Sequence, residues 1–271
     1  TTQKDYSSLI FNGIVTGNCS EILQVQEVSE INDDQTYKTL GTDISCNLGS
    51  TNIPNLLKSN DFEKSVDTMV RALTFVTNTS SIDSVPSIKN GNDKAHTIGL
   101  GAMGLHTAFA MNQIMYGSPE SIELTDAYFL ALNYYTLLSS NQIARQRGES
   151  FYNFDKSDYY SGKYFDKYTE EEFSFKSEKV SKIFENIEIP STWDWLRLKE
   201  DVRLYGLYHQ NRLAIAPTGS ISYVNETSAS LHPITRLIEE RQEKKTGKTY
   251  YPAPHLSNET IPFYKSAYDI D

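Results

Sequence analysis

The longest helix that the sequence predicts runs from Pro119 to Arg147, and no other segment limits the choice of fold as much. Proline in the first turn and Gly148 just after the last residue are the usual start and stop of a helix. Another helix is predicted from Asp61, with Phe62, Val66, Met69, Val70, Leu73 and Val76 on one face at helical spacing. Further helical stretches are expected from the glycine-rich segment 98–106 to about Asn112, near residues 176–186, and from Pro190 onward.

Strand signals lie between these helices. Alternating residues from Leu23 indicate a half-buried strand, residues 32–38 are typical of a loop, and the apolar run 213–217 indicates a buried strand. Residues 9–15 predict strand, tight turn and strand around Asn12-Gly13. Strands separated by long helices favour an α/β fold.

The formal net charge of −10 argues against a nucleic-acid-binding surface, because neutralising phosphates requires clustered lysine and arginine. The one basic cluster, Arg241 to Lys248, contains Glu243 and is interpreted as a solvated turn. No apolar run approaches the roughly 20 residues that span a bilayer, and no export signal is recognisable. We therefore expect a globular, cytoplasmic protein without a membrane partner. Since Thr1 is not a methionine, a fragment or a processed product is expected.

Cys19 and Cys46 are the only two cysteines. Without an export signal, they suggest a reducing compartment and thiols kept for chemistry or packing. The five histidines are scattered, and none has a histidine or cysteine neighbour at zinc spacing. We expect structural roles and no metal site for His96, His106, His209, His232 and His255.

Three short segments could carry chemistry. Cys19 and Glu21 would point to the same face of an extended chain, although a loop with an incidental acid is the commoner explanation of such a pair. Cys46 opens the segment 46–50. Pro217-Thr218-Gly219-Ser220-Ile221 follows a strand signal; its glycine allows close approach of an anion, and its hydroxyls and amides can donate hydrogen bonds. Taken alone, that segment is more typical of a simple strand-to-helix turn.

Together and in this order, these segments resemble the large (alpha) subunit of class I ribonucleotide reductases, particularly the Ib branch. The resemblance runs from Cys19 to about Asp271 and is carried by residues 19–25, 43–50, 84–88, 96–101, 216–223, 232–234 and 245–254. It implies that residues 19–271 form the carboxy-terminal part of the ten-stranded α/β barrel of that family. The implied reaction is the reduction of ribonucleoside diphosphates to deoxyribonucleoside diphosphates for DNA synthesis.

The resemblance also implies residue roles. Cys19 would become a thiyl radical that removes the 3′-hydrogen of the ribose, and Glu21 would accept the proton of the 3′-hydroxyl. Cys46 would be one of two reducing thiols, with its partner in the amino-terminal half of the family. The segment Pro217–Ile221 would hold the substrate diphosphate.

The implied partners lie on other polypeptides. A small (beta) subunit with a di-iron or di-manganese centre would generate the radical, a thioredoxin- or glutaredoxin-type reductant would restore the thiols, and an amino-terminal half would complete the large subunit. This chain would itself bind no cofactor or metal, and alone it would be inactive.

The resemblance fails before Cys19, where Gly17 stands at the position of the family's asparagine. Residues 1–18 instead resemble the carboxy-terminal segment of an intein. There, Asn18 would cyclise and Cys19 would accept the acyl chain as nucleophile, although Gly17 replaces the usual histidine. The alternative is that residues 1–18 are degraded or mis-joined sequence. Three hypotheses remain open: a reductase piece completed by splicing or association, a split-intein precursor with the reductase as passenger, and an inactive remnant.

Overall fold

A computed structural model describes residues 9–11, 14–16, 24–45, 47–80, 82–243 and 247–270. The helices are α1 (Ile53–Leu57), α2 (Phe62–Thr79), α3 (Pro86–Ala95), α4 (Leu105–Met111), α5 (Pro119–Arg147), α6 (Asp166–Thr169), α7 (Glu178–Ile183), α8 (Thr192–Tyr205) and α9 (Ile221–Val224). The strands are β1 (Leu9–Phe11), β2 (Ile14–Thr16), β3 (Glu30–Ile31), β4 (Tyr37–Thr39), β5 (Leu48–Asn52), β6 (Gly99–Met103), β7 (Ile238–Glu243) and β8 (Gly247–Pro252).

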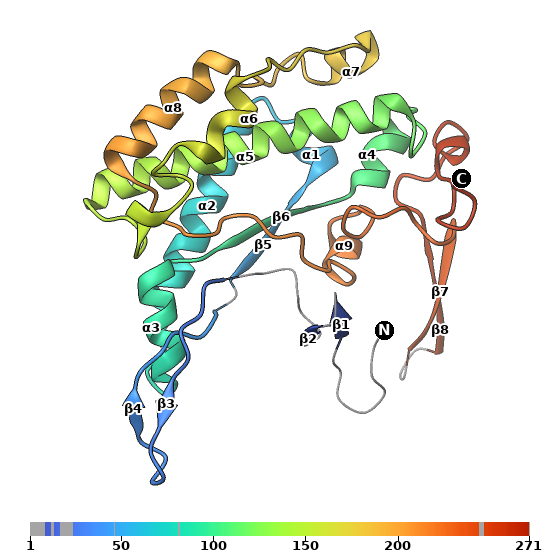
Figure 1. Ribbon diagram of the computed structural model, residues 1–271. Coiled ribbons are helices and arrows are strands. Elements are labelled where there is room, and N and C mark those ends of the chain that lie inside the picture. The colour runs from blue at the N-terminus through green and yellow to red at the C-terminus, as the bar shows by residue number, and fades with distance from the viewer. Residues whose placement is uncertain are drawn as a thin grey trace.

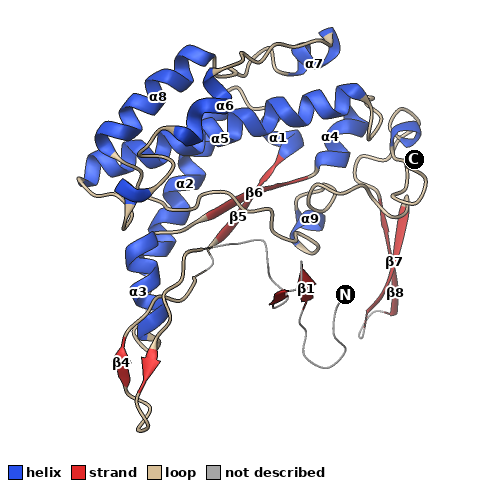
Figure 2. Ribbon diagram, in the orientation of Figure 1, coloured by secondary structure: helices blue, strands red, loops and turns tan. Residues whose placement is uncertain are grey.

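Parallel strands β5 and β6 form the centre of the fold, in register from Leu48 beside Gly99 to Asn52 beside Met103. Helices lie on one side of this pair, with α2 and α5 next to the strands and α8 farther out (Figure 1). Figure 2 shows the same layers by secondary structure, with the hairpins β3–β4 and β7–β8 projecting from them. The predicted α/β fold is confirmed, and the described strands do not close a barrel.

Helix α5 lies between the strand layer and α8, which explains why it is buried on several sides (Figure 1). A helix that is apolar around most of its circumference needs such an interior position. Tyr128 at its centre is fully buried, and its hydroxyl lies 2.7 Å from Oγ1 of Thr51 on β5. Farther along α5, the ring of Tyr134 meets the ring of Trp195 from α8 edge-on, with 5.1 Å between the ring centroids. The main core therefore joins all three layers.

The predicted helices at 119–147, near 176–186 and after Pro190 are confirmed as α5, α7 and α8. The helix from Asp61 is confirmed as α2, capped by the Asp61 side chain. Its predicted buried face is wrong at Val76, which is 45% exposed, whereas Thr77 is buried. The 3.6-residue repeat carries the buried stripe from Val70 to Leu73 and then to Thr77.

The glycine-rich segment 98–106 was expected to open a helix, but it begins with the buried strand β6, and α4 starts only after Gly104. A Cβ on Gly101 would lie 2.2 Å from the carbonyl oxygen of Ala214. Close approach of the two backbones thus accounts for glycine in this strand. Helix α3 precedes β6 and was not predicted.

Two hairpins also differ from the predictions. The expected loop at 32–38 is confirmed over residues 32–36, the turn of hairpin β3–β4, but Tyr37 and Lys38 already belong to β4. The described residues of the expected solvated turn at 241–248 belong to the strands of hairpin β7–β8. The half-buried strand expected from Leu23 is wrong in its described part, because Val28 is 89% exposed and only the bridge from Glu27 to Thr42 forms. The strand–turn–strand prediction for 9–15 is confirmed in its strands, since β1 and β2 pair antiparallel.

Candidate functional site

The predicted diphosphate segment 217–221 follows an extended segment, residues 211–216, that runs beside β6. The amide of Leu100 donates to the carbonyl of Arg212 at 2.8 Å, and the amide of Ala214 donates back to Leu100 at 3.2 Å. The bridge is parallel, so β5, β6 and 211–216 have their carboxyl ends on the same side. Ligands of open α/β sheets bind at that side. Residues 217–221 therefore lie where the fold favours a ligand.

Thr218 fastens this loop to the rest of the fold. Its Oγ1 accepts a hydrogen bond from the amide of Ser230 at 2.7 Å, and its amide donates to Oγ of Ser230 at 3.4 Å. Oγ of Ser230 in turn donates to the carbonyl of Ala216 at 3.1 Å. Because Thr218 is only 3% exposed, its hydroxyl serves the fold. The hydroxyl expected to face a ligand is therefore that of Ser220, which is exposed.

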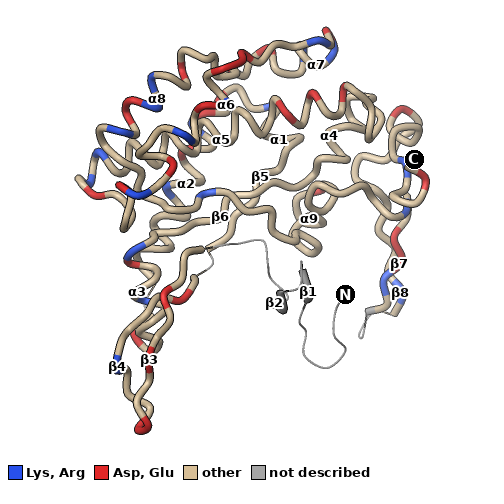
Figure 3. Tube along the Cα trace, viewed as in Figure 1, with Lys and Arg blue, Asp and Glu red and all other residues tan. Residues whose placement is uncertain are grey.

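The amides of Gly219, Ser220 and Ile221 donate no hydrogen bond to any described residue, whereas the amide of Ser222 closes the turn onto the carbonyl of Thr218 at 3.0 Å. Successive free amides in a turn form a concave site for an anion. Residues 213–225 include no charged side chain, and Figure 3 shows this stretch around α9 without acidic or basic residues. The loop can therefore bind an anion through peptide dipoles without repulsion from a nearby carboxylate of its own.

Other described residues tie the loop to the strand ends, and sequence reasoning missed them. Nδ2 of Asn52, the last residue of β5, donates to the carbonyl of Asn225 at 2.9 Å. Gly104 follows β6 with a φ of +88°, and its amide donates to the carbonyl of Ser230 at 3.0 Å. A Cβ on Gly104 would lie 2.0 Å from Oγ1 of Thr227. Gly104 lies in the glycine-rich segment 98–106, but nothing in the sequence indicates its neighbour.

The predicted catalytic residues Cys19, Glu21 and Cys46, and the splicing residue Asn18, lie outside the described residues. The described chain nearest to them is nevertheless informative. Gln24 donates from Nε2 to the carbonyl of Ser45 at 2.5 Å, and Glu27 and Thr42 form an antiparallel bridge. The chain after residue 23 therefore runs beside the chain before residue 46.

Helices α2 and α3 anchor the chain on both sides of residue 46. Oγ of Ser45 donates to Oδ1 of Asn92 at 2.9 Å, and Nδ2 of Asn47 donates to Oγ1 of Thr77 at 2.8 Å. These contacts come from the interior faces of the two helices, because Asn92 and Thr77 are buried. The entry to β5 is thus fixed by polar contacts.

Two of the histidines are fully buried in hydrogen-bonded positions. His209 lies 2.9 Å from both Oγ of Ser140 and Oγ1 of Thr74, and burial lowers its pKa. His106 accepts from the amide of Ile234 at Nδ1, so its Nε2 donates to the carbonyl of Phe263 at 3.1 Å. Burial lowers the pKa of His106 to about 4. Within the described residues, no three His, Cys, Asp or Glu side chains are grouped so that they could hold a metal ion.

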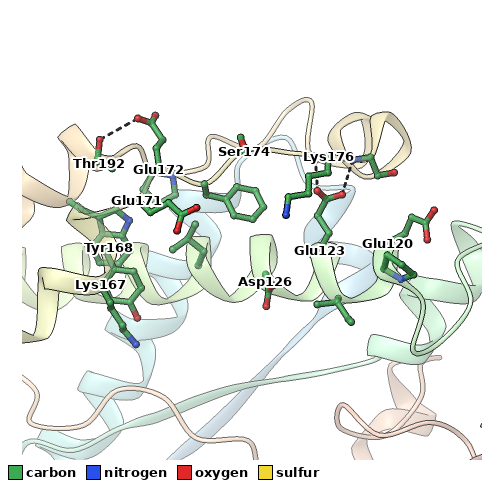
Figure 4. Close-up of a pocket in the computed structure, with 17 residues that line it drawn as sticks. Glu120, Glu123, Asp126, Lys167, Tyr168, Glu171, Glu172, Ser174, Lys176 and Thr192 are labelled. Carbon is green, nitrogen blue, oxygen red and sulfur yellow. Dashed lines mark hydrogen bonds between the residues drawn. The ribbon is translucent and has the colours of Figure 1, made fainter. Parts of the chain in front are cut away.

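A cavity of about 770 Å³ lies away from this loop, between the first half of α5, residues 167–177 and the start of α8 (Figure 4). Its floor is aromatic, with Tyr168 and Trp195. Five carboxylates and two lysines line it, namely Glu120, Glu123, Asp126, Glu171, Glu172, Lys167 and Lys176. The excess of negative charge disfavours a nucleotide, and none of the predicted site residues lines this cavity.

The fold and loop together are those of an α/β domain suited to hold an anionic ligand at the carboxyl ends of parallel strands. Residues 11–271 match the family described as "Ribonucleotide reductase, barrel domain". The chain belongs to this family. The match begins eight residues before the expected domain boundary at residue 19.

Relatives with known names agree. The chain is 49% identical over all of its 271 residues to the ribonucleoside-diphosphate reductase NrdEB subunit alpha of Bacillus subtilis, and equally to that of Bacillus phage SPbeta; it covers 25% of each. It is 45% identical over 253 residues, 93% of the chain, to another ribonucleoside-diphosphate reductase subunit alpha of Bacillus subtilis, covering 36% of it. The chain thus spans about a quarter to a third of the length of these relatives. In the described residues, no helix is long and apolar enough to cross a membrane.

Proposed function

We propose that this chain contributes the diphosphate-binding loop and the reacting thiols to the large subunit of an Ib-like ribonucleoside-diphosphate reductase. The observation that carries the proposal is the loop 217–221, with free amides and no charged side chain, at the carboxyl ends of parallel strands. A diphosphate is the anionic part of the proposed substrate. Family membership supports the class of enzyme.

In the proposed reaction, the thiyl radical of Cys19 takes the 3′-hydrogen of the ribose, and Glu21 takes the proton of the 3′-hydroxyl. The 2′-hydroxyl leaves as water. Cys46 and a thiol of the amino-terminal half supply two electrons and two protons, one to the departing hydroxide and one to the 2′-carbon, and end as a disulfide. Glu21 then returns its proton to the 3′-oxygen, and Cys19 returns its hydrogen to the 3′-carbon. The contact between Gln24 and Ser45 supports this scheme, because it brings together the chain after Glu21 and the chain before Cys46.

The partners follow from the same chemistry. The radical would come from a metal-containing small subunit, and a thioredoxin- or glutaredoxin-type protein would reduce the disulfide. A reducing cytoplasm suits thiols that must be restored after each turnover. The amino-terminal half would supply the second thiol and the remaining strands.

The test uses the large subunit in which this chain is joined to its amino-terminal half, together with the small subunit. Cys19→Ser should abolish deoxyribonucleoside diphosphate formation while leaving binding of the nucleoside diphosphate intact. Cys46→Ser should abolish multiple-turnover reduction in the same way. Unchanged reduction by the Cys19 variant would show that this thiol does not carry the radical. Equal affinity for a nucleoside and its diphosphate would refute the role of the loop.

A second function, protein splicing, is favoured by the antiparallel pair β1–β2 on either side of Asn12 and Gly13. In this proposal the upstream chain is first transferred to the thiol of Cys19 as a thioester. The side-chain amide of Asn18 then attacks its own carbonyl carbon, which forms a succinimide and breaks the 18–19 peptide bond. An S-to-N shift restores a peptide bond at Cys19.

Co-expression with an upstream fragment and mass measurement of the products tests this second function. The expected product begins the reductase sequence at Cys19 directly after foreign residues, and Asn18→Ala should prevent its formation. Retention of residues 1–18 on every molecule would exclude splicing.

A further inference from the structure

The hairpin β7–β8 turns a polar face toward the diphosphate loop. Alternate residues of a strand face opposite sides, and register partners in an antiparallel pair share a side. Glu239 and Arg241 on β7, with Thr249 and Tyr251 opposite them, are half-buried. The residues between them are exposed. The charged pair Glu239–Arg241 is only partly covered, and covering polar atoms costs least where a further hydrogen-bonding partner meets them.

That partner is Tyr223 of α9. Its hydroxyl donates to Oε2 of Glu239 at 2.6 Å, and Nε of Arg241 donates to Oε1 of Glu239 at 2.8 Å. The guanidinium of Arg241 lies 4.6 Å from the centre of the Tyr223 ring, and the ring of Tyr251 lies 4.5 Å from it. Tyr223, Glu239 and Arg241 therefore each contact the other two, and the ring of Tyr223 also packs against Tyr251. The hydrogen bond from Tyr223 also lowers the pKa of Glu239, which keeps the carboxylate charged.

Helix α9 needs such a tether. It has only four residues, and isolated helices of that length have no stability of their own. Two of its side chains, Ile221 and Val224, are exposed, so apolar packing does not hold them. Ser222 is buried but bonds back to Gly219 within the loop. Tyr223 is therefore the long side chain that connects α9 sideways to another element.

We propose that Tyr223, held by Glu239 and Arg241, is a positioning residue that fixes the free amides of residues 219–221 toward the substrate diphosphate. This inference rests on the proposed function. The hairpin acts on the substrate only through α9. Because Tyr223 lies two residues after Ile221, a sideways shift of its ring is passed directly to the last of the three amides.

Tyr223→Phe tests the proposal in the completed large subunit, assayed with the small subunit and a nucleoside diphosphate. The variant keeps the ring but loses the hydroxyl. We expect KM to rise about three- to tenfold with kcat within twofold, because part of the free energy of a charge-assisted hydrogen bond reaches the loop. Glu239→Gln keeps an acceptor for the hydroxyl and should raise KM less. Tyr250→Phe is the matched control, since Tyr250 lies on the outer face of the same hairpin and is 59% exposed. Its KM should not change.

The possible results separate the hypotheses. A purely structural role would lower kcat through loss of active enzyme and leave KM unchanged, and this result for Tyr223→Phe would overturn the proposal. An equal rise of KM in the Tyr250 variant would overturn it as well. If Tyr223→Phe does not fold, Glu239→Ala decides, because it removes the acceptor of the Tyr223 hydroxyl and an unchanged KM would exclude the tether. A parent enzyme that binds nucleosides and their diphosphates equally would instead refute the proposed function itself.

Discussion

Replacement of Gly219 by alanine separates stability from substrate binding. A Cβ at this position would meet no atom within 4 Å, and the backbone is not in the left-handed region. The free protein therefore accepts alanine without strain. We expect Gly219→Ala to cause no loss of stability beyond about 0.5 kcal/mol. A gain of about 0.4–1 kcal/mol is expected where the lower entropy of the unfolded chain dominates.

Binding should respond in the opposite direction. A phosphate oxygen that accepts from the amides of 219–221 must come within about 2.9 Å of the nitrogens, and a methyl group on Gly219 occupies space that such an anion needs. A displaced diphosphate loses one charge-assisted hydrogen bond, which contributes about 1.5–3 kcal/mol. At about 1.4 kcal/mol per factor of ten, the affinity should fall about 10- to 100-fold.

Titration calorimetry of the large subunit with a nucleoside diphosphate measures the affinity, and urea unfolding measures the stability. The corresponding nucleoside is the control, and its weak binding should be the same in both proteins. Unaltered affinity for the diphosphate in a stable Gly219→Ala protein would refute the close approach of substrate to this loop.

Three further predictions concern stability, measured by urea unfolding. Gly104→Ala should lower the free energy of unfolding by about 2–4 kcal/mol, because the added methyl group overlaps Thr227 and the backbone is left-handed. Gly148→Ala should lower it by only about 1–2 kcal/mol, because its backbone is also left-handed but no atom lies within 4 Å of the added methyl group. Equal losses in the two variants would contradict the overlap with Thr227. Trp195→Ala should cost about 3–5 kcal/mol because the ring is buried, and Trp193→Ala less than about 1 kcal/mol because that ring is 65% exposed. The pKa of His106 lies near 4 when folded and near 6.5 when unfolded, so the unfolded chain binds more protons in this window and the stability contribution is lost as pH falls through it. On the order of 2 kcal/mol should disappear between pH 7 and pH 5. The His106→Gln variant should lose less over that range, and an equal loss would exclude this histidine as the cause.

Local signals in the sequence were sufficient for the longer helices. Pro119, Gly148 and Asp61 are start and stop residues whose effect depends on near neighbours, so the ends of α5 and the start of α2 were predictable. The parallel strand pair β5–β6 was harder to predict from the sequence. Residues 98–106 are rich in glycine, which weakens any local preference. Strand β6 forms through pairing with β5, which precedes it by about fifty residues, and through the approach of Ala214 from farther along the chain.

In the candidate site, too, local features could be predicted from the sequence and tertiary contacts could not. Residues 217–221 could be found from the sequence because glycine and hydroxyl residues follow an apolar run. The sequence gives no sign of the hydrogen bonds between Thr218 and Ser230 or of the bond from Asn52 to Asn225, because both depend on tertiary contacts. The hairpin β7–β8 was missed because its inner face is charged and lacks the alternation of apolar and polar residues that marks a strand.

Within the part of the chain that the structure describes, the hydrogen bonds that shape the loop 217–221 all come from residues downstream of position 19. The hydrogen bond between Thr218 and Ser230 joins residues only 12 positions apart. Asn52, which bonds to Asn225, is the most distant of these residues in the sequence and still lies well after Cys19. Interruption of the polypeptide at Cys19 therefore severs none of them. In the proposed enzyme, the part that follows such a break would keep the loop 217–221 in its shape, and joining the parts would only have to add the remaining catalytic groups.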